Sequence, residues 1–198
     1  MITDRSLKEY LELLDLNIEE LKGKKILDLG SGRLQRFPRE LLQKIEDKAE
    51  VVGLDITLKE EERRKEIKEA QPYLYNSDKL GLIAASFLQL PFQDNSFDLV
   101  LSLYGMPLYL TSEDEKKSKE NIRRSVMEIL RVLKPGGEAR IFPSNDYLEQ
   151  VLREEKIQFS KKNKTILVTG TLITEIEEYL SKESKSINYN LVCFKKPH

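Results

Sequence analysis

The residues of this chain that could do chemistry by their type and spacing are two carboxylates and two glycines. Asp28 lies in the apolar run Ile26–Leu29, which ends in Gly30 and Gly32, and Asp55 ends a second apolar run. Glycines let a backbone approach a bound molecule closely, and a carboxylate can accept hydrogen bonds from both hydroxyls of a vicinal diol. Asp55 follows Gly30 by 25 residues, close to the spacing of about 20 that is typical of ribose-binding acids. The pattern indicates a nucleoside site, and the alternative for Asp55 is an N-cap of the segment that follows it.

These residues must be positioned by strands that end in turns. Seven apolar segments read as strands, with helical patterns between them. This alternation predicts an α/β fold, a three-layer sandwich with helices on both faces of a mostly parallel sheet. Ligands bind such sheets at the carboxyl ends of the strands. The predicted strands are Ile26–Leu29, Val51–Asp55, Leu82–Ser86, Phe97–Leu103, Glu138–Phe142, Thr165–Thr169 and Tyr189–Phe194.

The sequence also predicts where helices begin and end. Ser6 and Glu9 have the spacing of a capping box, which predicts an amphipathic helix or helix pair before Gly23. A later helix is expected to end at a turn formed by Lys134-Pro135-Gly136-Gly137, since proline stops a helix. The pattern leaves open whether Ile157–Ser160 pairs with Thr165–Thr169 as a hairpin. Other expectations are a solvated charged helix over 59–68, a loop over 71–79, and helices from about Asn145 and Thr174.

The composition favours one soluble domain over residues 1–198, with a helical segment 1–22, a core 23–143, and helices and edge strands over 144–198. The net charge is −1, so there is no positive excess of the kind that attracts nucleic acid or an anionic membrane. No run approaches the roughly 20 apolar residues of a membrane span, and the start lacks a signal-peptide pattern. We therefore expect a cytoplasmic protein. A single cysteine predicts neither an intrachain disulfide nor a Cys-rich metal site.

Three motifs occur in a characteristic order. Asp28-x-Gly30-x-Gly32 is similar to D-x-G-x-G-x-G, Leu90–Val100 reads L-P-F-x-D-N-S-F-D almost without a break, and residues 128–142 read EILRVLKPGGEARIF. Together they resemble the class I S-adenosylmethionine-dependent methyltransferases, in particular the methyltransferase type 11 family. A nicotinamide-dependent dehydrogenase fits less well, because its G-x-G-x-x-G fingerprint requires a third glycine where Gln35 stands.

The resemblance implies S-adenosylmethionine as the cofactor, bound by the core 23–143, and a Rossmann-like seven-stranded sheet with an antiparallel edge hairpin. Two positions depart from the family pattern. Leu34 replaces the usual third glycine, and Ser86 replaces an aspartate that usually binds the adenine amino group. A serine hydroxyl can accept from an amino group, but without charge assistance. The cofactor-binding residues that the resemblance implies are Asp28, Gly30, Ser31, Gly32, Asp55, Ile56, Ser86, Phe87, Leu88 and Leu103.

The implied reaction moves a methyl group to a nucleophile by in-line displacement, which relies mainly on proximity and orientation. We assign no catalytic residue, because the single histidine, His198, ends the chain and Cys193 lies in an apolar strand. An N-P-P-Y/F pattern typical of nucleobase and glutamine methylation is missing after the fourth strand, which favours a small-molecule acceptor. Tyr104, Met106 and Tyr109 are candidates for the acceptor wall, and loop packing explains them equally well.

A second hypothesis is a methyltransferase-like domain with weak or no catalysis that acts as a binding or partner subunit. Leu34 in place of glycine and Ser86 in place of aspartate keep this hypothesis open. The sequence contains no metal-binding spacing such as H-E-x-x-H or paired cysteines, and it gives no indication of the oligomeric state.

Overall fold

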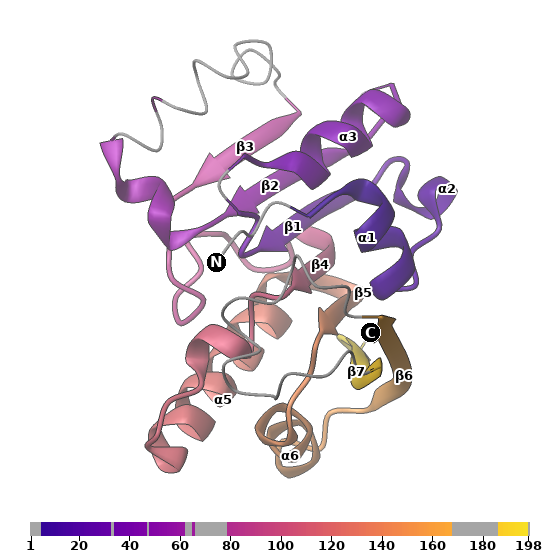
Figure 1. Ribbon diagram of the computed structural model, residues 1–198. Helices are drawn as coiled ribbons and strands as arrows, with labels where there is room; N and C mark the ends of the chain where they lie inside the picture. The colour runs from indigo at the N-terminus through magenta and orange to yellow at the C-terminus, as the bar shows by residue number, and fades with distance from the viewer. Residues whose placement is uncertain are drawn as a thin grey trace.

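A seven-stranded sheet forms the centre of the protein, in the order β3-β2-β1-β4-β5-β7-β6 (Figure 1). The computed structural model describes residues 5–32, 34–46, 48–61, 65, 79–167 and 186–197. Strands β1 to β5 are parallel, whereas β7 runs antiparallel to both β5 and β6. The strands are β1 Lys25–Leu29, β2 Glu50–Leu54, β3 Leu80–Ile83, β4 Phe97–Leu103, β5 Leu133–Phe142, β6 Phe159–Leu167 and β7 Ser186–Lys195.

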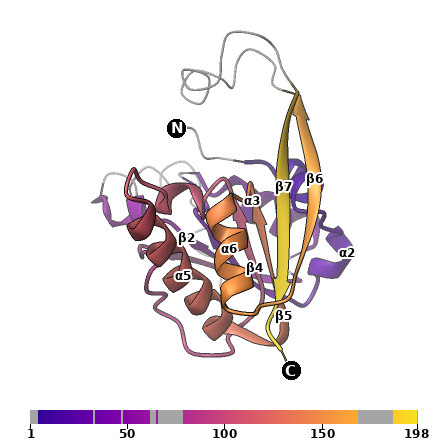
Figure 2. The ribbon, with the colours of Figure 1, turned by 90° about the horizontal axis from the view of Figure 1, so that it is seen from below.

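Helices cover both faces of this sheet, as Figures 1 and 2 show. One apolar cluster joins the sheet to α5 (Glu115–Val132) and α6 (Asp146–Glu154). A second cluster lies on the opposite face and joins the sheet to α1 (Leu7–Leu13), α2 (Ile18–Leu21) and α3 (Arg36–Lys44). The predicted three-layer sandwich and the predicted number of strands are therefore confirmed. Two short 3₁₀ helices, η1 (Ile56–Lys59) and η2 (Leu108–Leu110), follow β2 and β4.

The helix starts follow the capping chemistry of the sequence. Ser6 accepts from the backbone N–H of Glu9 while the Glu9 carboxylate accepts from the backbone N–H of Ser6, so the predicted capping box is present. It begins α1, and Asn17 caps α2, which makes the N-terminal segment a helix pair. Within this helical layer, the Glu40 carboxylate of α3 accepts from the N–H of Leu7 of α1 at 2.7 Å and so links the two helices.

Two strand boundaries differ from the prediction. Helix α5 ends at Val132 and β5 begins at Leu133, so Pro135 and its two glycines lie inside a strand and do not form a separate turn. A register shift between β4 and β5 at Phe97/Leu99 accommodates them, as proline and glycine often do at a bulge. Strand β3 ends at Ile83, because Ser86 has already left the sheet to form a bridge with Gln89.

The end of the chain is also simpler than the pattern suggested. The described parts of Ile157–Ser160 and Thr165–Thr169 do not pair with each other, because residues 159–167 form one continuous strand, β6, whose partner is β7. This long antiparallel ribbon forms one edge of the sheet (Figure 2). The expected helices over 59–68 and from about residue 174, and the loop over 71–79, lie largely or wholly outside the described residues.

Candidate functional site

The candidate site is built on the turn that follows β1. Gly30 and Gly32 have φ angles of +78° and +82°, a backbone region that side-chain-bearing residues rarely adopt. The N–H of Gly30 donates to the carbonyl oxygen of Leu54 at 2.8 Å, which holds the turn against the end of β2. The two glycines are therefore required by backbone conformation, and they form a buried turn at the carboxyl edge of the parallel strands.

Asp55 lies beside this turn and caps the 3₁₀ helix η1. Its Oδ1 accepts from the N–H and the hydroxyl of Thr57 at 2.9 and 2.7 Å, so the N-cap interpretation is confirmed. Its Oδ2 accepts from the N–H of Gly32 at 3.3 Å. The half-buried carboxylate thus joins the ends of β1 and β2, and Ile56 beside it is 46% exposed.

A close approach between β1 and β4 forms the other side of the turn. A Cβ placed on Gly30 would lie 3.1 Å from the Cα of Gly105 and 3.5 Å from Cζ of Phe87. A Cβ on Gly105 would lie 2.5 Å from the carbonyl oxygen of Leu29. Gly105 was not predicted as a site residue, although its place just after β4 could have indicated it. The segments that follow β1, β3 and β4 therefore converge on Gly30.

The segment Ser86–Leu88 forms a tight turn at this convergence. Ser86 is exposed, and its Oγ accepts from the N–H of Leu88 at 3.2 Å. Phe87 is half-buried and packs against the apolar cluster under α5. The structure therefore brings Phe87 to the glycine turn and leaves the Ser86 hydroxyl at the surface.

Asp28 lies beneath the turn and faces α1. It is fully buried, and its Oδ1 accepts a 2.8 Å hydrogen bond from the hydroxyl of Tyr10, whose ring stacks on Phe37 of α3. Its Oδ2 has no hydrogen-bond partner. Burial, opposed by the Tyr10 hydrogen bond and assisted by the nearby charge of Asp55, raises the pKa of Asp28 to about 7. This carboxyl supports the turn from below and is not displayed at its surface.

Gln35 is a further residue at the turn, and sequence reasoning missed it. It is fully buried, has a φ angle of +53°, and donates from Nε2 to the carbonyl oxygen of Gly32 and to Oγ of Ser31. Leu34, which replaces the third glycine, is 37% exposed beside it. One signal was available, because a glycine inside a strand, Gly53, often marks the close approach of another group.

The candidate acceptor residues separate into different environments. Met106 is buried in the core, where its N–H donates to Oγ of Ser102, and Leu103, which was predicted to bind the cofactor, is also buried. Tyr104 is half-buried, with the guanidinium of Arg5 4.5 Å above its ring, and burial raises its pKa to about 12. Tyr109 on η2 is 53% exposed. The packing interpretation thus describes Met106, whereas the two tyrosines lie nearer the surface.

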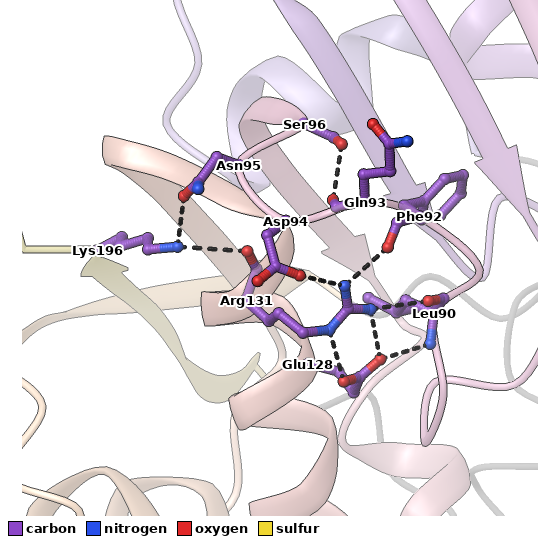
Figure 3. Close-up of polar contacts among 9 residues, drawn as sticks. All are labelled: Leu90, Phe92, Gln93, Asp94, Asn95, Ser96, Glu128, Arg131 and Lys196. Atoms are coloured by element: carbon purple, nitrogen blue, oxygen red, sulfur yellow. Dashed lines mark hydrogen bonds and ion pairs between the residues drawn. The ribbon is translucent and has the colours of Figure 1, made fainter.

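The segment Leu90–Val100, whose sequence carried much of the resemblance, is held by α5 (Figure 3). Arg131 donates to the backbone oxygens of Phe92 and Leu90 at 2.7 and 2.8 Å, while Oε2 of Glu128 accepts from the N–H of Leu90. These polar residues join a loop to a helix. Within the residues that the structure describes, no three His, Cys, Asp or Glu side chains gather as a metal site, and none of the described helices is long and apolar enough to cross a membrane.

The strand order and the glycine turn at the point where the order reverses, between β1 and β4, define an α/β protein of the class I methyltransferase type. The type 11 family model, described as "Methyltransferase domain", matches residues 27–141, which is more than half of the chain. The chain therefore belongs to this family of S-adenosylmethionine-dependent methyltransferases.

Among curated relatives, the chain is 33% identical to a 2-phytyl-1,4-naphtoquinone methyltransferase of Nostoc punctiforme, over 64% of this chain and 50% of the relative. It is 30% identical to a sterol 24-C-methyltransferase of Gibberella zeae, over 74% and 36% of the two chains. The chain thus spans half or less of the length of these relatives.

Solved structures share the fold at lower identity. A SAM-dependent methyltransferase of Methanosarcina mazei superposes with a TM-score of 0.59 at 18% identity, over 91% of this chain and 96% of that one. MccD protein superposes with a TM-score of 0.60 at 17% identity, over 96% and 95% of the two chains.

Proposed function

We propose that the protein transfers the methyl group of S-adenosylmethionine to a small, largely apolar acceptor. The observation that carries the cofactor assignment is the convergence on Gly30. Its positive φ angle and its close approach to Gly105 leave no room for a Cβ, and Gly32 in the same turn donates to the Asp55 carboxylate. A turn free of side chains at both glycines and an adjacent acid suit the amino-acid and ribose parts of this cofactor.

The residues at this edge divide the binding tasks. Gly30, Ser31 and Gly32 would present the main chain to the amino-acid end of the cofactor. Asp55 would accept from the ribose hydroxyls, since Oδ2 has Gly32 as its single partner among the described residues and keeps a lone pair. The turn Ser86–Leu88, with Ile56 on the opposite side, would border the adenine. When bound, S-adenosylmethionine supplies a methyl group on a positively charged sulfur.

The acceptor side has an apolar rim. In the described part of the chain five large apolar side chains are exposed, and four of them follow β1, β2 or β4, whose carboxyl ends share one edge of the sheet. These four are Leu34, Ile56, Leu108 and Tyr109. With Ile56 taken by the adenine, an apolar acceptor would cover the other three, and the two relatives above are named for a phytyl-naphthoquinone and a sterol, both largely apolar.

Tyr104 would orient the acceptor and would not deprotonate it. Because burial raises its pKa to about 12, the phenol stays protonated near neutral pH and can donate a hydrogen bond to an acceptor oxygen. The acceptor must then be reactive in the form that the site binds, or lose its proton to water. Proximity and orientation supply the remaining rate enhancement.

Calorimetric titration with S-adenosylhomocysteine and, in parallel, with NAD tests the cofactor assignment. We expect micromolar binding of the first and none of the second, and tighter binding of NAD would overturn the proposal.

Release of S-adenosylhomocysteine should then be measured with a reduced naphthoquinone that carries an isoprenoid chain and with the same ring without the chain. The chain should lower the KM. Binding of the cofactor product without turnover on any acceptor would favour the alternative, a binding or partner subunit.

A further inference from the structure

Gln35 occupies a position that a glutamine seldom takes. Its φ angle is +53°, it is fully buried, and it directly precedes α3 without capping that helix. Such a backbone conformation costs free energy for a residue other than glycine, and burial of an amide costs more unless its polar atoms are paired. The side chain must therefore make interactions that compensate for both.

The orientation of the Gln35 amide follows from its partners. The carbonyl oxygen of Gly32 can only accept, so the atom 2.6 Å from it must be the donor Nε2. Nε2 also lies 2.8 Å from Oγ of Ser31. Through Nε2 the amide thus binds two consecutive residues of the glycine turn, Ser31 and Gly32. Its Oε1 points away from them and has no hydrogen-bond partner.

Oε1 lies in the space that Gly53 leaves empty. A Cβ on Gly53 would be only 2.0 Å from Oε1. Gly53 of β2 is the register partner of Asp28 of β1, and register partners on adjacent parallel strands project to the same face of the sheet. Oε1 of Gln35 and the Asp28 carboxyl therefore lie on the same face of the sheet, above paired positions of β2 and β1.

Asp28 also has a buried oxygen without a hydrogen-bond partner. Oδ1 accepts from the Tyr10 hydroxyl, whereas Oδ2 is buried and unpartnered. Two buried oxygens without a donor on the same face of adjacent strands are unfavourable, and a single proton on Oδ2 would satisfy both by forming an O–H···O hydrogen bond. Burial already raises the pKa of Asp28 to about 7, so this proton is available near neutral pH.

We propose that Gln35 is a positioning residue that holds the glycine turn from below, with its amide oxygen accepting a hydrogen bond from a protonated Asp28. The unit runs from Tyr10 through Asp28 and Gln35 to the Gly32 carbonyl. It ties the turn to the start of α3 where the family pattern has a third glycine, while Leu34 is 37% exposed. The binding test of this proposal rests on the proposed cofactor, whereas its stability test does not.

The other groups around Asp28 are few. From α1 it faces Tyr10, which lies near Glu9 and Arg5, and from the end of β2 it faces Asp55. From α3 the neighbour of Tyr10 is the apolar ring of Phe37, and the register partner on β4 is Leu101. Among the described residues, Asp55 is the like charge that acts on Asp28, and it favours the protonated form of Asp28.

The first experiment changes the amide. Gln35→Met keeps the length of the side chain and removes both hydrogen bonds. Gln35→Gly removes the side chain but relieves the backbone strain of the positive φ angle. Gln43→Met, at an exposed position of α3, is the matched control. We expect the first two variants to bind S-adenosylhomocysteine at least tenfold more weakly and the control to bind as the natural protein. Recovery of affinity in Gln35→Gly would show that only the backbone conformation matters and would overturn the proposal.

The second experiment tests the proton without any cofactor. Asp28→Asn places a permanent N–H donor where the proton is proposed. In Asp28→Leu the side chain occupies the same position but has no donor. In denaturant unfolding between pH 5 and 8, the natural protein should lose stability as the pH rises. The stability of Asp28→Asn should not fall over this range. Asp28→Leu should be less stable than Asp28→Asn at every pH.

Carbon-13 NMR of the Asp28 carboxyl should give a titration midpoint near 7. A midpoint below 5, or equal pH dependence in the natural protein and in Asp28→Asn, would overturn the protonated contact. If the natural protein fails to bind S-adenosylhomocysteine while these stability and NMR results hold, the proposed function fails and the positioning role of Gln35 stands.

Discussion

Arg131 and Asp94 form an ion pair of 2.8 Å that fastens the segment Leu90–Val100 to α5, with the same guanidinium also bound to two backbone oxygens (Figure 3). The neighbouring Glu128 accepts from this guanidinium, which lowers the pKa of the Glu128 carboxyl. The planar fork of arginine suits several acceptors at once. The loop that leads into β4 is thereby fixed by a side chain from another layer.

Arg131→Gln should lower the free energy of unfolding by about 1–3 kcal/mol, because it leaves partly buried backbone oxygens without donors. Arg123 on the same helix is the control. Its side chain is 30% exposed, against 31% for Arg131, but its partners are the surface carboxylates of Glu120, Glu154 and Glu155. Arg123→Gln should therefore cost less than about 1 kcal/mol. Equal losses in urea unfolding would contradict this role of the loop contacts.

Asp55 variants separate its two roles. Asp55→Ala should weaken S-adenosylhomocysteine binding at least tenfold, since a hydrogen bond to a charged acceptor contributes about 1.5–3 kcal/mol. Asp55→Asn can still cap η1 but lacks the charge, so it should keep stability and lose affinity. Asp114→Ala removes the N-cap of α5 and should lose about 1 kcal/mol of stability without affecting binding. A variant of Asp55 that melts lower but binds unchanged would rule out the ribose role.

Leu34→Gly tests whether the departure from the glycine motif matters. Leu34 is 37% exposed, and Gln35 makes the contacts to the turn, so we expect affinity for S-adenosylhomocysteine to change by less than tenfold, about 1.4 kcal/mol. Calorimetry on both proteins decides the question. If the natural protein shows no binding and the variant binds, the result would instead support a methyltransferase-like domain that has lost its cofactor.

Tyr10→Phe should shift the pH dependence of stability upwards. The folded-state pKa of Asp28 is raised to about 7 from 3.8, so the folded protein holds more protons and stability falls as pH rises between these values, by up to about 1.4 kcal/mol per pH unit. The Tyr10 hydroxyl stabilises the charged form. Without it the pKa of Asp28 should rise further, and unfolding curves should show the decline extending to higher pH. A decline that ends at lower pH than in the natural protein would contradict this.

The sequence was sufficient for much of the fold because the apolar segments are short, strongly patterned and bounded by turn residues. Phe97–Leu103 was predicted with both its ends correct, and the capping box at Ser6 and Glu9 was found from two residues alone. Pro135 misled the prediction of β5, because a bulge absorbs a proline and two glycines that otherwise indicate a turn. Tertiary pairing decides such cases, and local patterns do not contain it.

The candidate site was predictable where local chemistry fixes it. Positive φ angles at Gly30 and Gly32 follow from the turn, and the cap at Asp55 follows from its place after a strand. The roles of Tyr10 and Gln35 depend on how α1 and α3 pack across β1, a long-range relationship between residues that carry no motif. Met106 was equally ambiguous, because only packing distinguishes a wall from a core residue.

Gly53 carries a consequence for how this sequence can change by descent. Its missing side chain is the space that Gln35 fills, since a Cβ there would lie 2.0 Å from the amide oxygen. An alanine at this position would expel the amide, and a lineage that loses the glutamine no longer needs the gap. We therefore expect the two positions to be inherited as a pair: descendants that keep Gln35 keep Gly53, while those that regain a glycine at position 34 are free to alter both.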